Sequence, residues 1–253
     1  MITKKYYKLI RVSHEDSGYF YIKNISNEVG EFKFVKSGSV SSPNTEYSLD
    51  GVNWTSYDFT NLPTINVSSN IYLRSTSWTV NGGGSYFSID FSKDYEIGGN
   101  ILSIINYNDM TTTTTIGGNN QNGYLVYLFK NQTKLKSIEK LLLGNVNTIT
   151  NSGGFYGPIG YMFYGCSSLE KGIDFSQVTT ADGGAFGGLY GNCYKLNTMY
   201  APNISSWVNN NFEGWMTNAG NQVTGTKTFY APSGLAIPTG NSGIPSGWTR
   251  VDY

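Results

Sequence analysis

The sequence is poor in charged residues. Lys, Arg, Asp and Glu make up 13% of its 253 residues, and the formal net charge is zero. A nucleic-acid-binding surface needs clustered Lys and Arg to displace counterions from phosphates. The overall balance therefore gives no reason to expect a nucleic-acid partner. The charge is uneven, because residues 1–36 carry seven basic against four acidic side chains and residues 37–123 carry two against seven. The N-terminal segment is modestly basic as a result.

Histidine is almost absent, and this scarcity argues against common catalytic and metal sites. The single histidine, His14, lies in a polar stretch beside Glu15 and Asp16, which is typical of a surface position. The chain has no G-x-S-x-G motif, so no Ser-His-Asp triad is expected. It also has no Cys/His cluster with zinc spacing and no EF-hand loop. We expect no metal, no cofactor and no catalytic residue.

A pair of carboxylates is the remaining route to an enzyme, since two acids can hydrolyse a glycosidic bond. The nearest candidates are Asp174 and Asp182, which fall in one repeat of the C-terminal half. The simpler interpretation is that each caps a turn or faces solvent.

Cysteines and long apolar runs are also scarce. Cys166 and Cys193 are 27 residues apart and occupy the same position in two similar segments. They are expected to be small buried side chains, although a disulfide between the two segments stays open. The longest apolar run, residues 124–129, is too short to span a bilayer. The first residues lack the apolar core of a secretory signal, so we expect synthesis without Sec export if Met1 is the native start.

Tyrosine, glycine, asparagine, serine and threonine are plentiful instead, which is typical of a compact β-rich chain. The alternation of Phe32, Lys33 and Phe34 predicts a half-buried strand, and the dipeptide Asp50-Gly51 predicts a hairpin turn. About five to seven short strands separated by turns predict a small immunoglobulin-like β-sandwich at residues 37–110. Residues 1–36 would supply an N-terminal arm and the first strands.

A polar, low-complexity stretch follows the predicted sandwich. Residues 111–123 read TTTTTIGGNNQNG and carry little apolar surface. We expect an exposed linker loop here, between two domains.

After this stretch, a pattern of aromatic residues, a turn and a leucine occurs three times. The copies are YLFKNQTKL at 127–135, YMFYGCSSL at 161–169 and LYGNCYKL at 189–196. Their final leucines are 34 and 27 residues apart, a spacing typical of stacked structural repeats. Residues 124–253 are therefore predicted to form a short solenoid with a C-terminal cap. The expected core positions are Leu135, Phe163, Cys166, Leu169, Cys193 and Leu196.

These segments resemble the BspA-type leucine-rich repeat of bacterial surface adhesins. The resemblance is carried by MFYGCSSL with IDFS at 173–176 and by the later YAPS and IPSGW. Upstream, EYSLDGVNW, IYLRS and GGNILSIINYNDM resemble the β-domain that precedes such repeats in proteins of gut bacteria and their tailed phages. The similarity covers about residues 45–253, but the family's asparagine-rich DLSNFDTSNVTNM run is reduced here to DFSQVTTADGG.

Binding is the function that the composition favours. Tyr and Trp offer large rigid faces at low entropic cost, and Asn, Ser and Gly add adaptable hydrogen bonds. Each aromatic candidate also has the alternative of a place in the repeat core. A lysine group, Lys130, Lys134, Lys136 and Lys140, predicts either a contact face or a solvated surface. The candidate ligand contacts are Tyr156, Tyr164, Tyr190, Tyr194, Trp207 and Trp215.

The resemblance and the missing export signal together favour a non-enzymatic structural protein of a phage virion, such as a head fibre, tail fibre or capsid decoration. It would be made in the host cytoplasm and exposed on the virion surface. The N-terminal segment would join other virion proteins, and the repeats would engage a host-surface glycan or protein. We expect a homo-oligomer, a trimer first and a dimer second, with no nucleic-acid partner and no membrane insertion. The alternatives are a bacterial cell-surface adhesin and a glycan-cleaving enzyme.

Overall fold

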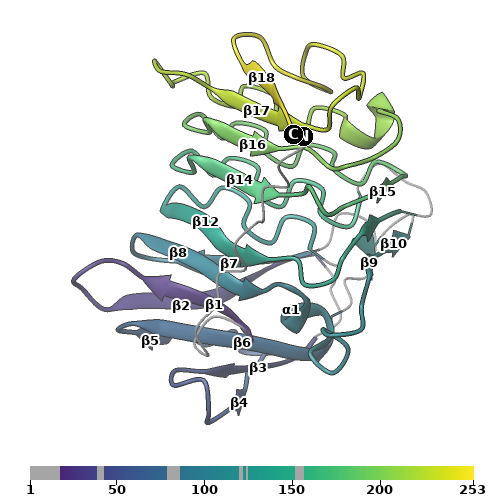
Figure 1. The fold of residues 1–253 in the computed structure, drawn as a ribbon. Helices are drawn as coiled ribbons and strands as arrows, with labels where there is room; N and C mark the ends of the chain where they lie inside the picture. The colour runs from purple at the N-terminus through teal and green to yellow at the C-terminus, as the bar shows by residue number, and fades with distance from the viewer. Residues whose placement is uncertain (1–17, 39–42, 79–85, 120–121, 124, 152–156) are drawn as a thin grey trace, which may run out of the picture.

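The computed structural model describes residues 18–38, 43–78, 86–119, 122–123, 125–151 and 157–253 (Figure 1). The chain is mainly β, with 35% of its residues in strands and 4% in helices, which confirms the predicted β-rich class. Among the residues that the structure describes, the helical elements are one short α-helix, α1 (Leu102–Asn106), and one 3-10 turn, η1 (Asn209–Phe212). Within the described part of the chain, no helix has the length and apolar character needed to cross a membrane.

The N-terminal half contains two sheets. The first has six strands, antiparallel except for the parallel pair β12–β8, in the spatial order β12 (Leu135–Leu142), β8 (Tyr95–Asn100), β1 (Phe20–Asn24), β6 (Asn70–Ser77), β3 (Asn44–Ser48) and β4 (Thr55–Ser56). The second is antiparallel and has the order β5 (Ile65–Val67), β2 (Gly30–Ser37) and β7 (Tyr86–Phe91).

Buried and more exposed side chains alternate along these strands, as β2 illustrates. In β2, Phe32 and Phe34 are buried while Lys33 between them is half-exposed, as the sequence pattern predicts. The Phe34 ring packs edge-on against Tyr57 at 4.9 Å and lies 5.7 Å from Trp78. The hairpin predicted at Asp50-Gly51 is present, because β3 pairs with β4 across that turn.

The first strands predicted within residues 1–36 are present as β1 and β2. Strand β1 lies between β6 and β8 and pairs with both. The buried side chains of Phe20 and Ile22 belong to the main core, which fixes the strand in place. The first 17 residues lie outside the described part of the chain.

The C-terminal half contributes parallel strands. One sheet has the order β14 (Lys171–Asp174), β16 (Thr198–Tyr200), β17 (Thr228–Ala231) and β18 (Thr249–Asp252). In Figure 1 these strands and β12, β8, β1, β6 and β3 lie one above another as a single curved wall.

A smaller parallel sheet corrects the predicted linker. It consists of β9 (Thr115–Ile116), β13 (Thr148–Ile149) and β15 (Thr180–Ala181). Ile116 is fully buried in the core, so the stretch is not an exposed loop throughout. The polar composition suggested a loop, but the buried side chain of Ile116 and the pairing of β9 with β13 hold this stretch as a strand. A short hairpin of β10 (Gly118–Asn119) and β11 (Asn122–Gly123) follows.

Stacked turns form the side of the C-terminal half opposite the wall. The backbone N–H groups of Tyr127, Phe129 and Asn131 donate to carbonyl oxygens one turn further along the chain, and later turns repeat the pattern. Rings align inside the stack: Phe129 lies 5.5 Å from Phe163, which lies 5.6 Å from Tyr190, with interplanar angles of 6° and 4°. The six predicted core residues are all fully buried: Leu135, Phe163, Cys166, Leu169, Cys193 and Leu196.

The two cysteines are free thiols rather than a disulfide. Each sulfur lies 3.0 Å from a backbone carbonyl oxygen of the preceding turn: Cys166 Sγ from Phe129 and Cys193 Sγ from Phe163. Burial raises the pKa of both thiols above the usual range, so they stay protonated at neutral pH.

Candidate functional site

The stacked turns place two residues of every turn in the left-handed backbone region, four positions apart. These residues have φ between 54° and 75°: Tyr127 and Asn131, Tyr161 and Gly165, Gly188 and Asn192, and Gly214 and Asn218. Glycine and asparagine adopt this conformation readily, whereas a bulky residue rarely does. The first position is tyrosine in two turns and glycine in the next two.

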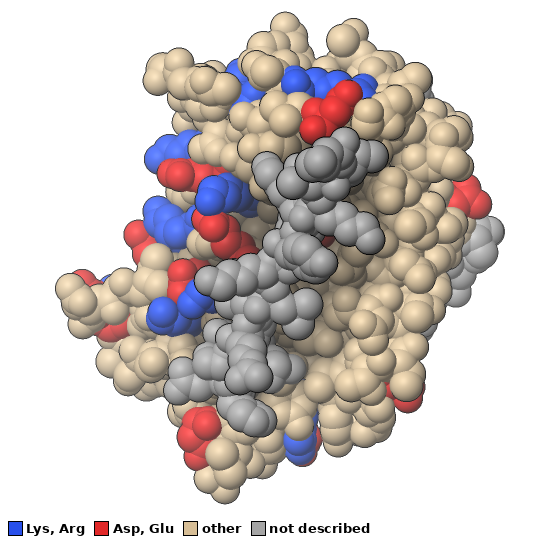
Figure 2. Space-filling view, viewed as in Figure 1, with Lys and Arg blue, Asp and Glu red and all other residues tan. Residues whose placement is uncertain are grey.

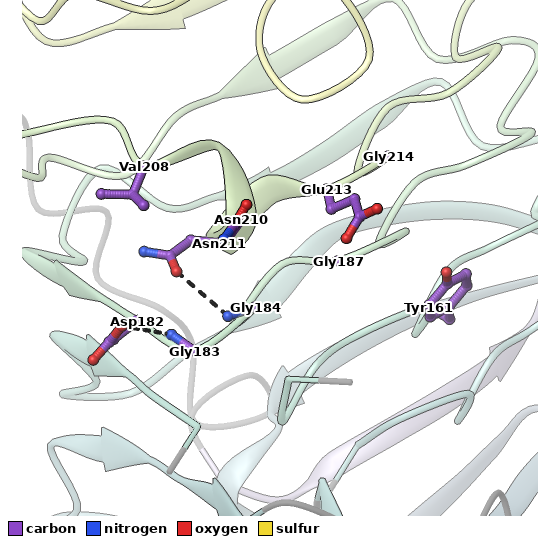
Figure 3. Close-up of a pocket in the computed structure, with 10 residues that line it drawn as sticks. All are labelled: Tyr161, Asp182, Gly183, Gly184, Gly187, Val208, Asn210, Asn211, Glu213 and Gly214. Atoms are coloured by element: carbon purple, nitrogen blue, oxygen red, sulfur yellow. Dashed lines mark hydrogen bonds between the residues drawn. The ribbon is translucent and has the colours of Figure 1, made fainter. Parts of the chain in front are cut away.

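A groove of about 700 Å³ opens where the tyrosines give way to glycines (Figure 3). This volume lies within the range of about 300–1,000 Å³ typical of small-ligand sites. Glycines form much of the surface, and side chains of different turns stand around them. In Figure 3, Asp182 and Val208 lie at one end and Tyr161 at the other. The lining residues are Tyr161, Asp182, Gly183, Gly184, Gly187, Val208, Asn210, Asn211, Glu213 and Gly214.

Tyr161 supplies the aromatic side of this groove. Its ring lies over the backbone of Gly188, where an added Cβ would come within 2.4 Å of ring carbon Cε1. The rings of Tyr127 and Tyr164 flank it at 5.4 and 5.5 Å. Only glycine at position 188 leaves room for this arrangement, so the sequence fixes the ring against the backbone of the next turn.

Asn211 holds the opposite side in place. Its side chain is 4% exposed, and its amide nitrogen donates to the carbonyl oxygen of Ala181 at 2.8 Å. Its amide oxygen accepts a longer bond of 3.4 Å from the backbone N–H of Gly184 (Figure 3). Beneath it, Phe212 is fully buried and stacks on Trp207 with ring centroids 3.7 Å apart. The groove is therefore built on packed elements rather than on a free loop.

The polar side chains at the groove are amides and carboxylates. Asp182, Asn210 and Glu213 are all exposed, and Asp182 accepts a bond of 2.7 Å from the backbone N–H of Gly183. None of the described residues that line the groove is Lys or Arg. Among the described residues, no group of three or more His, Cys, Asp or Glu is placed to hold a metal ion.

Two of the predicted ligand contacts are wrong. Tyr190 and Trp215 are fully buried. The Tyr190 hydroxyl accepts a bond of 2.8 Å from the backbone N–H of Ile173, and burial raises its pKa well above the usual value. Trp215 Nε1 donates to the carbonyl oxygen of Gly243 at 3.0 Å. Both side chains face inward because they stand at core positions of their turns.

None of the other predicted ligand contacts is among the described residues that line the groove, although Tyr164 lies next to it. Tyr164 is half-buried next to Tyr161, and its hydroxyl accepts a bond of 2.7 Å from Asn192 Nδ2. Trp207 is half-buried and donates from Nε1 to the carbonyl oxygen of Ser242 at 2.7 Å. Tyr194 is half-buried outside the groove. Tyr156 and His14 lie outside the described residues.

The structure does not bring Asp174 and Asp182 together in one cavity. Asp182 lines the groove, whereas Asp174 borders a separate depression of about 350 Å³ beside β12 and β14. Each carboxylate accepts a bond from a nearby backbone N–H, Asp174 from Ser176 at 2.8 Å. Both therefore cap turns, which is the simpler of the two interpretations given to them above.

The four predicted lysines differ in their contacts. Lys130 Nζ lies 4.4 Å from the ring centroid of Tyr127, on the turn side. Lys136 instead pairs with Asp94 at 3.4 Å, and Lys134 donates to the carbonyl oxygen of Ser92. Figure 2 shows blue and red side chains interleaved along one flank of the molecule. Lys130, Lys134 and Lys136 are therefore each engaged by a different partner, and Lys140 is an exposed residue of β12.

Most of the groove was missed from the sequence. The run DGGAFGG at 182–188 supplies three of the glycines that line the groove. The high glycine content of this run is the local sequence feature that indicates a surface with few side chains. Asn210 and Glu213 come from the following turn, and their proximity depends on the stacking register.

Comparison of the chain with protein-family models, curated proteins and solved structures finds no match. Its function is therefore argued from the groove and the fold.

Proposed function

We propose that residues 124–253 form a BspA-type leucine-rich-repeat solenoid with a C-terminal cap, and that the preceding strands form an immunoglobulin-like sandwich. The repeating left-handed positions, the hydrogen bonds between turns and the aligned rings support the solenoid. The two antiparallel sheets with their aromatic interior support the sandwich.

On this scaffold, the chain acts as a non-enzymatic attachment protein of a phage virion, a head or tail fibre or a capsid decoration. Its N-terminal segment joins it to other virion proteins, and the groove engages a glycan or protein on the host surface. The observation that carries the proposal is the open groove of about 700 Å³, which has the Tyr161 ring at one end and exposed polar side chains along it. A cleft of this size with an aromatic side and a few polar groups is typical of a ligand-binding site.

A homo-oligomer, a trimer first and a dimer second, fits this role. One open groove offers a small contact area, and several copies on one particle convert weak binding into firm attachment. The bacterial cell-surface adhesin is the alternative, since it would use the same groove in the same way.

Antibodies raised against the purified chain test the location. We expect them to label intact virions in electron micrographs and to reduce adsorption of those virions to host cells. Labelling of bacterial cells that produce no particles would replace the virion role with the adhesin. Labelling of neither would overturn attachment as the function.

A glycan-cleaving role would use a different pair of carboxylates from the one expected from the sequence, namely Asp182 and Glu213, because both line the groove. Release of shorter oligosaccharides from a host-surface glycan incubated with the chain would favour it. An Asp182→Asn, Glu213→Gln double variant would then have to lose that activity.

A further inference from the structure

Resting on the proposed attachment function, we infer that the groove binds a neutral oligosaccharide and discriminates against acidic ones such as uronic-acid or sialic-acid glycans. Three features of the groove lead to this ligand class: an aromatic face, hydrogen-bonding groups with no Lys or Arg among the described lining residues, and a pre-formed floor.

Tyr161 provides the aromatic face. A sugar ring has an apolar side formed by its C–H groups, and a tyrosine ring is a flat apolar partner with a polar tip. The ring is positioned by the Gly188 backbone beneath it and by its two tyrosine neighbours. Its backbone conformation is one that glycine would occupy more easily, and positions 188 and 214 show that glycine serves in equivalent turns.

The polar groups match sugar hydroxyls. Asp182 and Glu213 accept hydrogen bonds, and Asn210 both donates and accepts them. Carboxylates and amides placed around an aromatic face can hold several hydroxyls at once, because each hydroxyl is both donor and acceptor. Asp182 comes from one turn and Asn210 and Glu213 from the next, and all three side chains are exposed, so a ligand can reach all of them.

The charge of the groove sets the preference. Two carboxylates line it, and no Lys or Arg is among the described lining residues. An acidic sugar placed there would meet like charges with no compensating cation, an arrangement that disfavours a wrong partner. A neutral sugar meets no such penalty.

The floor is pre-formed. Asn211 is buried and bonded to Ala181 and Gly184, and Phe212 beneath it is fully buried. A ligand therefore does not have to order a loop when it binds, which lowers the entropic cost of association.

Saturation-transfer NMR and titration calorimetry on the full chain test the inference, with maltotriose, cellotriose and chitotriose as neutral probes and trigalacturonate as the acidic probe. We expect at least one neutral probe to bind and trigalacturonate to bind more weakly than that probe. Tyr161→Gly removes the ring without forcing the backbone, and we expect it to lower the affinity by about tenfold.

Tyr194→Ala is the control. It removes a half-buried tyrosine side chain that lies outside the groove. We expect this variant to keep its affinity within about twofold of the original chain.

Glu213→Lys provides a second variant should Tyr161→Gly fail to fold. Glu213 is exposed, so the fold tolerates the change, and the new cation should shift the preference toward trigalacturonate.

An unchanged preference in the Glu213→Lys variant would contradict the inference. So would equal neutral-sugar affinity in the Tyr161→Gly variant, stronger binding of trigalacturonate by the original chain, or binding of no probe. In each of these cases the attachment function still stands if antibodies to the chain label virions and reduce adsorption, whereas absence of labelling removes that function independently.

Discussion

At the scale of single residues, the sequence predicts a binding residue correctly only when it shows whether the side chain points into the core or toward the surface. Aligning the two repeats on Cys166 and Cys193 places Tyr190 at the position of Phe163 and Gly191 at that of Tyr164. The buried Tyr190 was therefore predictable from that alignment, whereas composition alone suggested a surface tyrosine. Trp215 falls in a turn without a cysteine, so no residue marks its register. Its burial became visible only when the turns were stacked.

Asp50 illustrates a residue whose charge stabilises a turn. Hydrogen bonds from Asn53, and then from Val52 and Ser48, hold the pKa of this exposed carboxyl well below its usual 3.8. A lowered pKa means that the stabilisation is fully present above about pH 4 and is lost as the pH falls through the folded-state value.

We expect the melting temperature of the chain to fall as the pH is lowered below about 4. Asp50→Asn removes the titrating group while keeping an amide that can cap the turn, so its melting temperature should fall less steeply. Circular dichroism melts between about pH 2 and pH 6 measure both slopes. Equal slopes for the two chains would show that Asp50 does not contribute to the acid sensitivity.

At the scale of secondary-structure elements, strong alternation is predictable and very short strands are not. Strand β2 alternates clearly and was predicted from Phe32, Lys33 and Phe34. Strands β9, β13 and β15 have two residues each, which is too short for any periodicity, and they exist because parallel neighbours pair with them. The pairing of β12 with β8 joins segments that are distant in sequence, so no local sequence pattern predicts it.

The ring column of the stacked turns should contribute much of their stability. Phe163 is fully buried between Phe129 and Tyr190, so Phe163→Ala leaves a cavity and removes both ring contacts. We expect it to lower the free energy of unfolding by about 3–5 kcal/mol, as buried phenylalanines do. Urea unfolding followed by circular dichroism measures the change as a shift in the midpoint.

Tyr164→Ala is the control for this substitution. It removes the adjacent aromatic side chain, which is only half-buried, and it should reduce the free energy of unfolding by less than half as much as Phe163→Ala. Similar losses for both variants would mean that the column is no more important than the surface next to it.

At the scale of the whole molecule, the sequence suggested separate domains joined by a linker, and the structure shows continuity instead. Strand β12 follows the first stacked turn and also pairs with β8 of the six-stranded sheet. The ring of Phe20 in β1 lies 5.9 Å from that of Phe129 in the first turn, and one hydrophobic cluster extends from Phe20 to Trp248. The change of composition around residues 111–123 therefore does not coincide with a break in the hydrophobic cluster.

This continuity predicts that the two halves unfold together. Separation of the halves would expose Leu135 and Phe129, both fully buried, and would break the β12–β8 ladder, so neither half should remain folded without the other. We expect one calorimetric transition with equal calorimetric and van't Hoff enthalpies. Native-state hydrogen exchange adds a local measurement, in which amides of β1 and β6 should open with the same free energy as amides of β16 and β17. Loss of protection in one pair of strands at a lower denaturant concentration than in the other would show two independent units, and the shared core would then be too weak to couple them.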